Sequence, residues 1–91
     1  LQANAANNLT LTGNTVNGGY HGIRINGTAA NPSTGLMMNG NTANNAYAYG
    51  LYIIGNNNPV VKGTTVSMRA GNVNSIGIVI QEVQNGMELS A

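Results

Sequence analysis

The chain repeats the stretch Gly50-Leu51-Tyr52-Ile53-Ile54 once before and once after itself. The earlier copy is residues 22–26 and the later copy is residues 77–81, and each copy has a glycine, an apolar residue, a free position and then an isoleucine. The glycines that open the three copies are 28 and 27 residues apart. Self-similarity at a fixed period of this length predicts a repeat architecture.

A second repeated segment alternates with the first. Leu9-Thr10-Leu11-Thr12-Gly13-Asn14-Thr15 returns as residues 36–42, more loosely as residues 61–65, and in its opening as residues 87–91. The position two residues after the last apolar residue of each copy is occupied by Gly13, Gly40, Gly63 and Ala91. These residues are spaced 27, 23 and 28 residues apart. Two alternating segments on one shared period predict a coiled solenoid.

The spacing of apolar residues predicts strands for both repeated segments. Apolar residues alternate at period two, as in Ile23/Ile25 and Leu51/Ile53, which is the spacing of one face of a strand. Glycine and asparagine fill the segments between them and suit tight corners. We therefore predict an all-β solenoid in which equivalent residues of successive coils stack about 4.8 Å apart. The predicted stacks are Gly22 on Gly50 on Gly77, and Ile25 on Ile53 on Ile80.

Composition excludes several classes of function. The charged residues are only Arg24, Lys62, Arg69, Glu82 and Glu88, and the chain has no aspartate and no cysteine. Such scattered cations make no basic patch, so we expect no nucleic-acid partner. The sequence contains no apolar run of about 18 residues, so we expect no membrane insertion. We expect residues 1–91 to form a single segment of a longer chain or assembly, because open solenoid ends need cover.

In the pattern of the repeat, a strand is followed by Gly-Asn-Thr, an apolar residue and Asn, and then by Gly-Ile-x-Ile. This pattern resembles the repeats of right-handed parallel β-helix proteins of the pectin-lyase-like type. The resemblance covers about residues 8–91 and implies a right-handed parallel β-helix of about three coils, each of 23–28 residues. The family includes polysaccharide lyases, hydrolases, epimerases, phage tailspikes and adhesins. The composition, rich in Asn and Gly and poor in charge, is most similar to that of a bacteriophage tailspike.

No catalytic residues can be assigned from the sequence. Glycoside hydrolysis usually needs two convergent carboxylates, and the chain has only Glu82 and Glu88, which we expect on different faces. The lyases of this family commonly use Asp-bound calcium, and this chain has no aspartate. Arg24 and Lys62 could neutralise a uronate or could be solvated surface cations. We expect no metal site and no cofactor.

Two further features of the sequence make structural predictions. The pairs Asn14/Asn41 and Asn17/Asn44 occupy equivalent corners, where stacked amides can bond along the solenoid axis. Strict alternation would place His21 on the inward face with Ile23, unless Gly22 breaks the alternation.

The sequence also predicts where a ligand would bind. Extra residues lie at two corners, around residues 28–34 and 67–72, and corner loops of solenoids often form the binding face. Tyr20, Arg24 and Tyr52 are expected on the outward side of the Gly-x-x-Ile strands. Aromatic faces beside Arg and Asn suit a sugar, although the same row could instead pack against a neighbouring chain.

These features together suggest a function. The main hypothesis is a segment of a phage tailspike-like or surface-fibre protein, extracellular or part of a virion tail, that binds bacterial surface polysaccharide and assembles as a homotrimer. One alternative is a part of a secreted polysaccharide lyase, hydrolase or epimerase. Another is an adhesin stalk with no role in glycan binding. We expect this segment to have no catalytic activity when it is alone.

Overall fold

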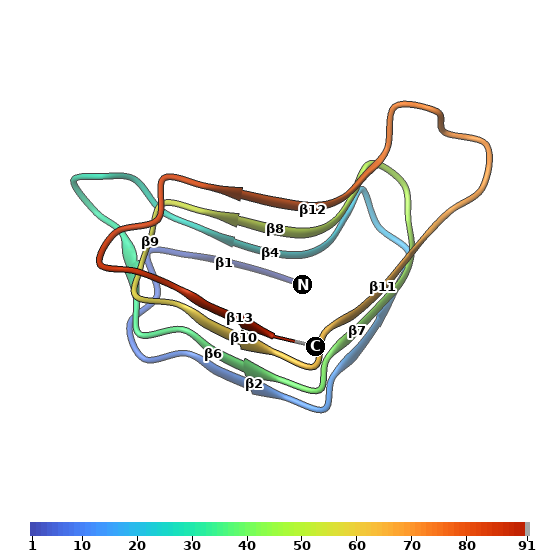
Figure 1. The fold of residues 1–91 in the computed structure, drawn as a ribbon. Helices are drawn as coiled ribbons and strands as arrows, with labels where there is room; N and C mark the ends of the chain where they lie inside the picture. The colour runs from blue at the N-terminus through green and yellow to red at the C-terminus, as the bar shows by residue number, and fades with distance from the viewer. Residues whose placement is uncertain (91) are drawn as a thin grey trace.

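The computed structural model describes residues 1–90 and shows a parallel β-solenoid of about three turns, with no helix among these residues (Figure 1). Thirteen short strands follow one another along the chain. They are β1 (Gln2–Asn4), β2 (Thr10–Thr12), β3 (Thr15–Asn17), β4 (His21–Asn26), β5 (Ser33–Thr34), β6 (Met37–Asn39), β7 (Thr42–Ala46), β8 (Tyr49–Ile54), β9 (Asn56–Asn57), β10 (Val60–Lys62), β11 (Thr65–Met68), β12 (Ile76–Gln81) and β13 (Glu88–Ser90).

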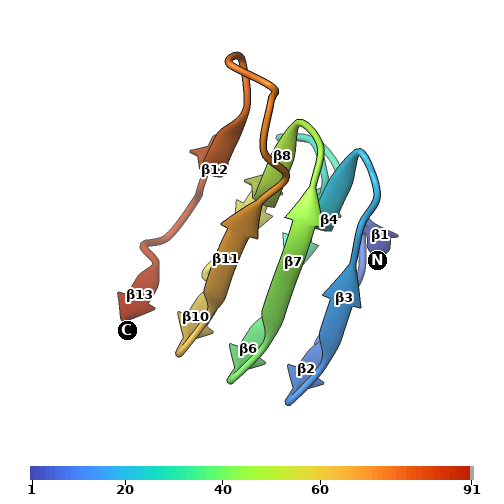
Figure 2. The ribbon, with the colours of Figure 1, turned by 90° about the vertical axis from the view of Figure 1, so that its right-hand side faces the viewer.

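The strands form four parallel sheets, which we name A to D in the order in which each coil reaches them. Sheet A has the order β1-β4-β8-β12, sheet B contains β5 and β9, sheet C has the order β2-β6-β10-β13, and sheet D has the order β3-β7-β11. Figure 1 shows sheet A facing sheet C across the interior, while Figure 2 shows the strands of sheet D side by side. Every strand therefore pairs with its counterpart one coil away, as the repeats predict.

The predicted stacks are present in sheet A. Ile25 pairs with Ile53, and Ile53 with Ile80. The same register places Gly22 beside Gly50 and Gly50 beside Gly77. The repeat alignment is confirmed.

The core is a column of apolar side chains enclosed by sheets A, C and D. Its fully or almost fully buried members are Ile23, Ile25, Leu36, Met38, Ala43, Leu51, Ile53 and Val61. Ile80 was expected to be buried with the other two isoleucines of its column, but it is only partly buried. The physical reason is its position in β12, the outermost strand of sheet A, which has a neighbouring strand on one side only.

The predicted asparagine ladder forms at the corner between sheets C and D. Asn41 is fully buried; its Nδ2 donates to the carbonyl of Leu11 at 2.8 Å, and its Oδ1 accepts from the backbone N–H of Asn14 at 3.0 Å. The predicted pair Asn17 and Asn44 lies not at a corner but in β3 and β7 of sheet D, where Asn44 Nδ2 donates to Asn17 Oδ1 at 3.3 Å. The Asn41 amide thus satisfies backbone groups that the corner would otherwise leave unpaired in the interior.

A second buried asparagine was not predicted. Asn56 is fully buried, and its Nδ2 donates to the carbonyls of Ile25 at 2.9 Å and Ile54 at 3.1 Å. It lies at the opposite corner of the coil, between sheets A and B. Its register partner in the neighbouring coil is Ser33, which follows a longer loop, so no repeated asparagine marks the position.

Both predicted insertions are loops, and the bounds of both differ from expectation. Ser33 and Thr34 were expected in the first loop, but they form β5 and pair with β9. The first lies between β4 and β5. The second was expected to include Ser67 and Met68, but these residues belong to β11 and pair with β7 across a bulge. The second insertion is therefore residues 69–75, which project from the coil between β11 and β12 (Figure 1).

Candidate functional site

The outer face of sheet A carries the side chains predicted to bind a ligand, and an irregularity in its strands decides which residues meet there. In β4 the consecutive residues Gly22 and Ile23 are both buried, so the inside–outside alternation shifts by one position. His21 therefore lies outside, on the same face as Arg24, and not inside with Ile23. The same two buried positions recur in β8, where Tyr49 takes the place of His21.

Five rings form an aromatic cluster at the start of β4 and β8. The members of this aromatic cluster are Tyr20, His21, Tyr47, Tyr49 and Tyr52. His21 is its centre: its ring stacks on Tyr49, with centroids 5.1 Å apart and planes inclined by 16°, and meets Tyr52 edge-on at 4.8 Å. Tyr20 and Tyr47 are its exposed members, at 59% and 45% exposure. The cluster offers both rigid ring faces and hydroxyl groups to a ligand.

Arg24 joins this cluster to the rest of the face. Its guanidinium carbon lies 5.2 Å from the centroid of the Tyr52 ring, and the two residues are register partners in β4 and β8. The structure thus brings Arg24 and Tyr52 together, as predicted. Tyr20 is one step removed from them, because its ring contacts His21, Tyr47 and Tyr49 rather than Tyr52.

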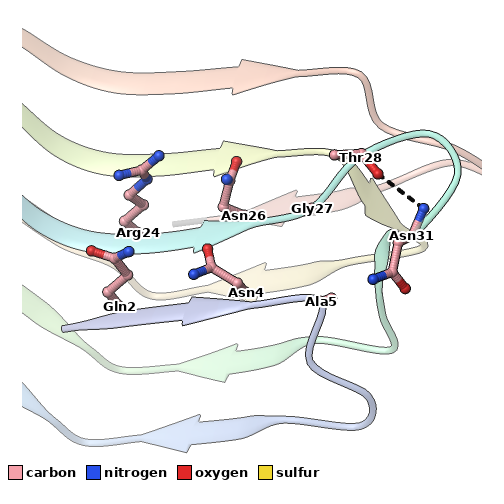
Figure 3. Close-up of a pocket in the computed structure, with 8 residues that line it drawn as sticks. All are labelled: Gln2, Asn4, Ala5, Arg24, Asn26, Gly27, Thr28 and Asn31. Atoms are coloured by element: carbon pink, nitrogen blue, oxygen red, sulfur yellow. Dashed lines mark hydrogen bonds between the residues drawn. The ribbon is translucent and has the colours of Figure 1, made fainter.

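Beyond Arg24 the face opens into a shallow hollow of about 320 Å³ (Figure 3). The residues that line this amide-lined hollow are Gln2, Asn4, Ala5, Arg24, Asn26, Gly27, Thr28 and Asn31. Gln2 is the register partner of Arg24, and Asn4 is the partner of Asn26. The loop after β4 closes the hollow, and its turn is held by the backbone N–H of Asn31, which donates to Thr28 Oγ1 at 3.0 Å.

The sequence predicted the hollow only in part. Residues 28–34 were named as a candidate binding loop, and Thr28 and Asn31 do line the hollow. Gln2 and Asn4 were missed because β1 has only Ala3 as its inward apolar residue, which is too weak a strand signal. The other predicted loop, residues 69–75, joins sheet A at the opposite ends of its strands and cannot share this hollow.

Lys62, Glu82 and Glu88 lie apart from Arg24, whereas the guanidinium carbon of Arg69 lies 5.6 Å from the centroid of the Tyr47 ring in the aromatic cluster. Lys62 pairs with Glu88 at 3.3 Å on sheet C, so it is not a second cation for the same ligand. Glu82 follows the end of β12, whereas Glu88 lies in β13 of sheet C. Within residues 1–90, no three His, Cys, Asp or Glu side chains gather in a way that could hold a metal ion. No helix that could cross a membrane occurs in the same residues.

The electrostatics of the aromatic cluster predict a pH-dependent stability. Burial, then the positive charge of Arg24, lowers the pKa of His21 from its ordinary value of 6.5. The unfolded chain therefore binds a proton at His21 more readily than the folded chain does, so stability is greatest above pH 6.5 and falls as the pH drops through the folded pKa. We expect the melting temperature to decrease on acidification below that pH.

Melting curves of the wild type and of His21→Gln would measure this effect. The variant has no imidazole to protonate, and so its melting temperature should depend less on pH in this range. Equal pH dependence of the two proteins would show that His21 does not cause it.

Comparison of the chain with models of protein families, with curated proteins and with solved structures found no significant match.

Proposed function

We propose that this chain is a β-helix segment of a tailspike-like or surface-fibre protein, and that the outer face of sheet A binds bacterial surface polysaccharide. The observation that supports the proposal is the continuous surface from the aromatic cluster through Arg24 to the amide-lined hollow. Sugars present flat C–H faces that pack on rings, and hydroxyl groups that bond to carboxamides and to guanidinium groups. Short parallel strands hold these side chains on a rigid support.

Binding without turnover is the role that these side chains support best. Glycosidase chemistry usually needs two carboxylates within about 10 Å of each other on either side of one bond. The lining of the amide-lined hollow contains no carboxylate. The proposal therefore treats the segment as a binding element. If the parent protein is a depolymerase, its acids come from elsewhere in the assembly.

The proposal includes an extracellular or virion location and a homotrimeric assembly. Support for assembly comes from large apolar side chains that remain on the surface, including Val73 at 95% exposure and Ile76 at 48%. Residues of this kind are candidates for burial between subunits. Sedimentation of the protein would measure its mass, and a well-behaved monomer would contradict the homotrimer.

The test of the function is binding of purified capsular polysaccharides and lipopolysaccharide O-chains, measured by calorimetry. In Tyr52→Ala, we expect affinity to fall at least about tenfold, or about 1.4 kcal/mol, because an aromatic contact at the centre of the face is lost. Tyr52→Phe keeps the ring and should keep most of the affinity.

Met37→Ala is the matched control for this test. Met37 is 50% exposed on sheet C, so its loss removes a large apolar side chain from the surface but leaves the proposed face intact. Circular dichroism of each variant separates loss of binding from loss of fold. Equal binding by wild type and Tyr52→Ala would refute the proposed face.

A further inference from the structure

The guanidinium group of Arg24 is available to pair with an anion. Its side chain makes no ion pair among the described residues, and its Nε is buried without a hydrogen-bond partner. A donor removed from water and left unpaired costs free energy, and a charged donor costs more than a neutral one. A carboxylate that accepted from this guanidinium would form charge-assisted hydrogen bonds, which are about twice as strong as neutral ones.

The surroundings of Arg24 leave its charge uncompensated. The polar side chains that share the amide-lined hollow with it are carboxamides, such as Gln2 and Asn26, together with the hydroxyl of Thr28. These groups can bond to hydroxyls but cannot neutralise a cation. Arg24 is also the second cause, after burial, of the lowered pKa of His21, its neighbour on the face.

The polar groups also define a direction across the face. Along β4 they run from His21 through Arg24 to Asn26, a path of about 16 Å at about 3.3 Å per residue, and continue into the hollow. Along the solenoid axis the face becomes apolar, since the next partner of Tyr52 is Val79. On the other side of β4, Gln2 and Asn4 of β1 lie beside Arg24 and Asn26, so an extended polar ligand finds its partners along β4 and β1 and not toward β12.

From these observations we propose that the glycan bound by this face is acidic, that a carboxylate of the glycan pairs with Arg24, and that the sugar chain lies along β4 from the aromatic cluster to the amide-lined hollow. This inference rests on the proposed function and narrows its ligand class to glycans that carry hexuronate, sialate or another carboxylate substituent. Arg24 then selects among glycans, while the rings and carboxamides supply contacts that any sugar could use.

The first experiment is an array of bacterial surface glycans that contains neutral and carboxylate-bearing members. The binders should be acidic, and their binding should weaken as salt rises, because a partly exposed ion pair is screened. The best binder is then compared with the same glycan after its carboxylates have been reduced to alcohols. We expect reduction to weaken binding at least tenfold.

Charge variants assign the effect to Arg24. Arg24→Gln should lose at least tenfold in affinity for the acidic glycan and bind the reduced glycan within about twofold of the wild type. Arg24→Lys should recover only part of the loss, because lysine lacks the planar fork that matches a carboxylate. Lys62→Gln removes the same charge from sheet C and should bind like the wild type.

Asn31→Ala tests the direction of the ligand. The substitution removes the side chain that lines the hollow but keeps the backbone N–H that holds the loop. Oligosaccharides of six units should bind the variant more weakly, while a disaccharide bearing the carboxylate should not distinguish it from the wild type. No effect on the longer ligand would overturn the path along β4.

The outcomes separate the two proposals. Binding that is equal for the acidic glycan and its reduced form overturns the acidic ligand and leaves glycan binding standing. If the glycans that bind are mainly neutral members of the array, the acidic ligand is also overturned and glycan binding still stands. If no glycan of the array binds, the proposed function fails, and the inference fails with it.

Discussion

Replacing Ile53 with alanine should destabilise the protein by about 2–5 kcal/mol, because it opens a cavity in the middle of the solenoid. Ile53 is fully buried and stacks between Ile25 and Ile80. Both neighbours are fixed by parallel ladders, so the strands cannot easily close over the space that is lost. A small domain has only about 5–15 kcal/mol of stability in total, so this is a large fraction. Urea unfolding followed by circular dichroism would measure the change.

Ile54→Ala is the matched control for that experiment. Ile54 is the next residue of the same strand, but it lies half-buried on the outer face, between Asn26 and Gln81. Its truncation should cost less than about 1 kcal/mol, since no enclosed cavity forms. Similar losses from the two substitutions would mean that the inward and outward faces of β8 have been assigned wrongly.

The sequence was sufficient to predict the solenoid and its register. Side chains alternate with a period of two, so a one-residue error in register would move every side chain to the wrong face. The glycine and isoleucine of each Gly-x-x-Ile copy occur at nearly constant spacing, which fixed the alignment of β4, β8 and β12. Asn41 was predicted in its ladder for the same reason, because Asn14 repeats it 27 residues earlier.

Features that do not repeat were harder to predict. The orientation of His21 is a separate case: Gly22 and Ile23 are both buried, the same shift recurs in β8, and the sequence marked Gly22 as a place where the alternation could break without deciding the outcome. Asn56 has no repeated counterpart that would mark it as buried. The amide-lined hollow arises where β1 meets a single inserted loop, so it is built from residues that occur once. A repeat predicts what successive coils share, and this site lies where they differ.

The glycines that open the Gly-x-x-Ile copies should differ sharply in their tolerance of a side chain. A Cβ added at Gly50 would lie 2.6 Å from the carbonyl oxygen of Gly77, 3.1 Å from Met68 Sδ, and in steric overlap with Val66 Cγ1. The backbone of Gly50 is not in the left-handed region, so the requirement is for space and not for a special conformation. Overpacking typically costs about 1–3 kcal/mol and occasionally more. We expect Gly50→Ala to reach at least the upper end of that range, because a backbone carbonyl held in a ladder cannot move aside.

Gly77→Ala provides the comparison within the same stack. Gly77 occupies the equivalent position in β12, yet a Cβ there would meet only Val66 Cγ1, at 4.0 Å, which is an ordinary contact. We expect its cost to be below about 1 kcal/mol, and both costs can be measured by urea unfolding. The repeat makes the two glycines look equivalent in the sequence, but only Gly50 has a further strand of sheet A stacked against it on the crowded side. Equal destabilisation by the two substitutions would show that these glycines are required for their backbone conformation and not for space. The close approach of successive coils would then not explain why the glycine recurs.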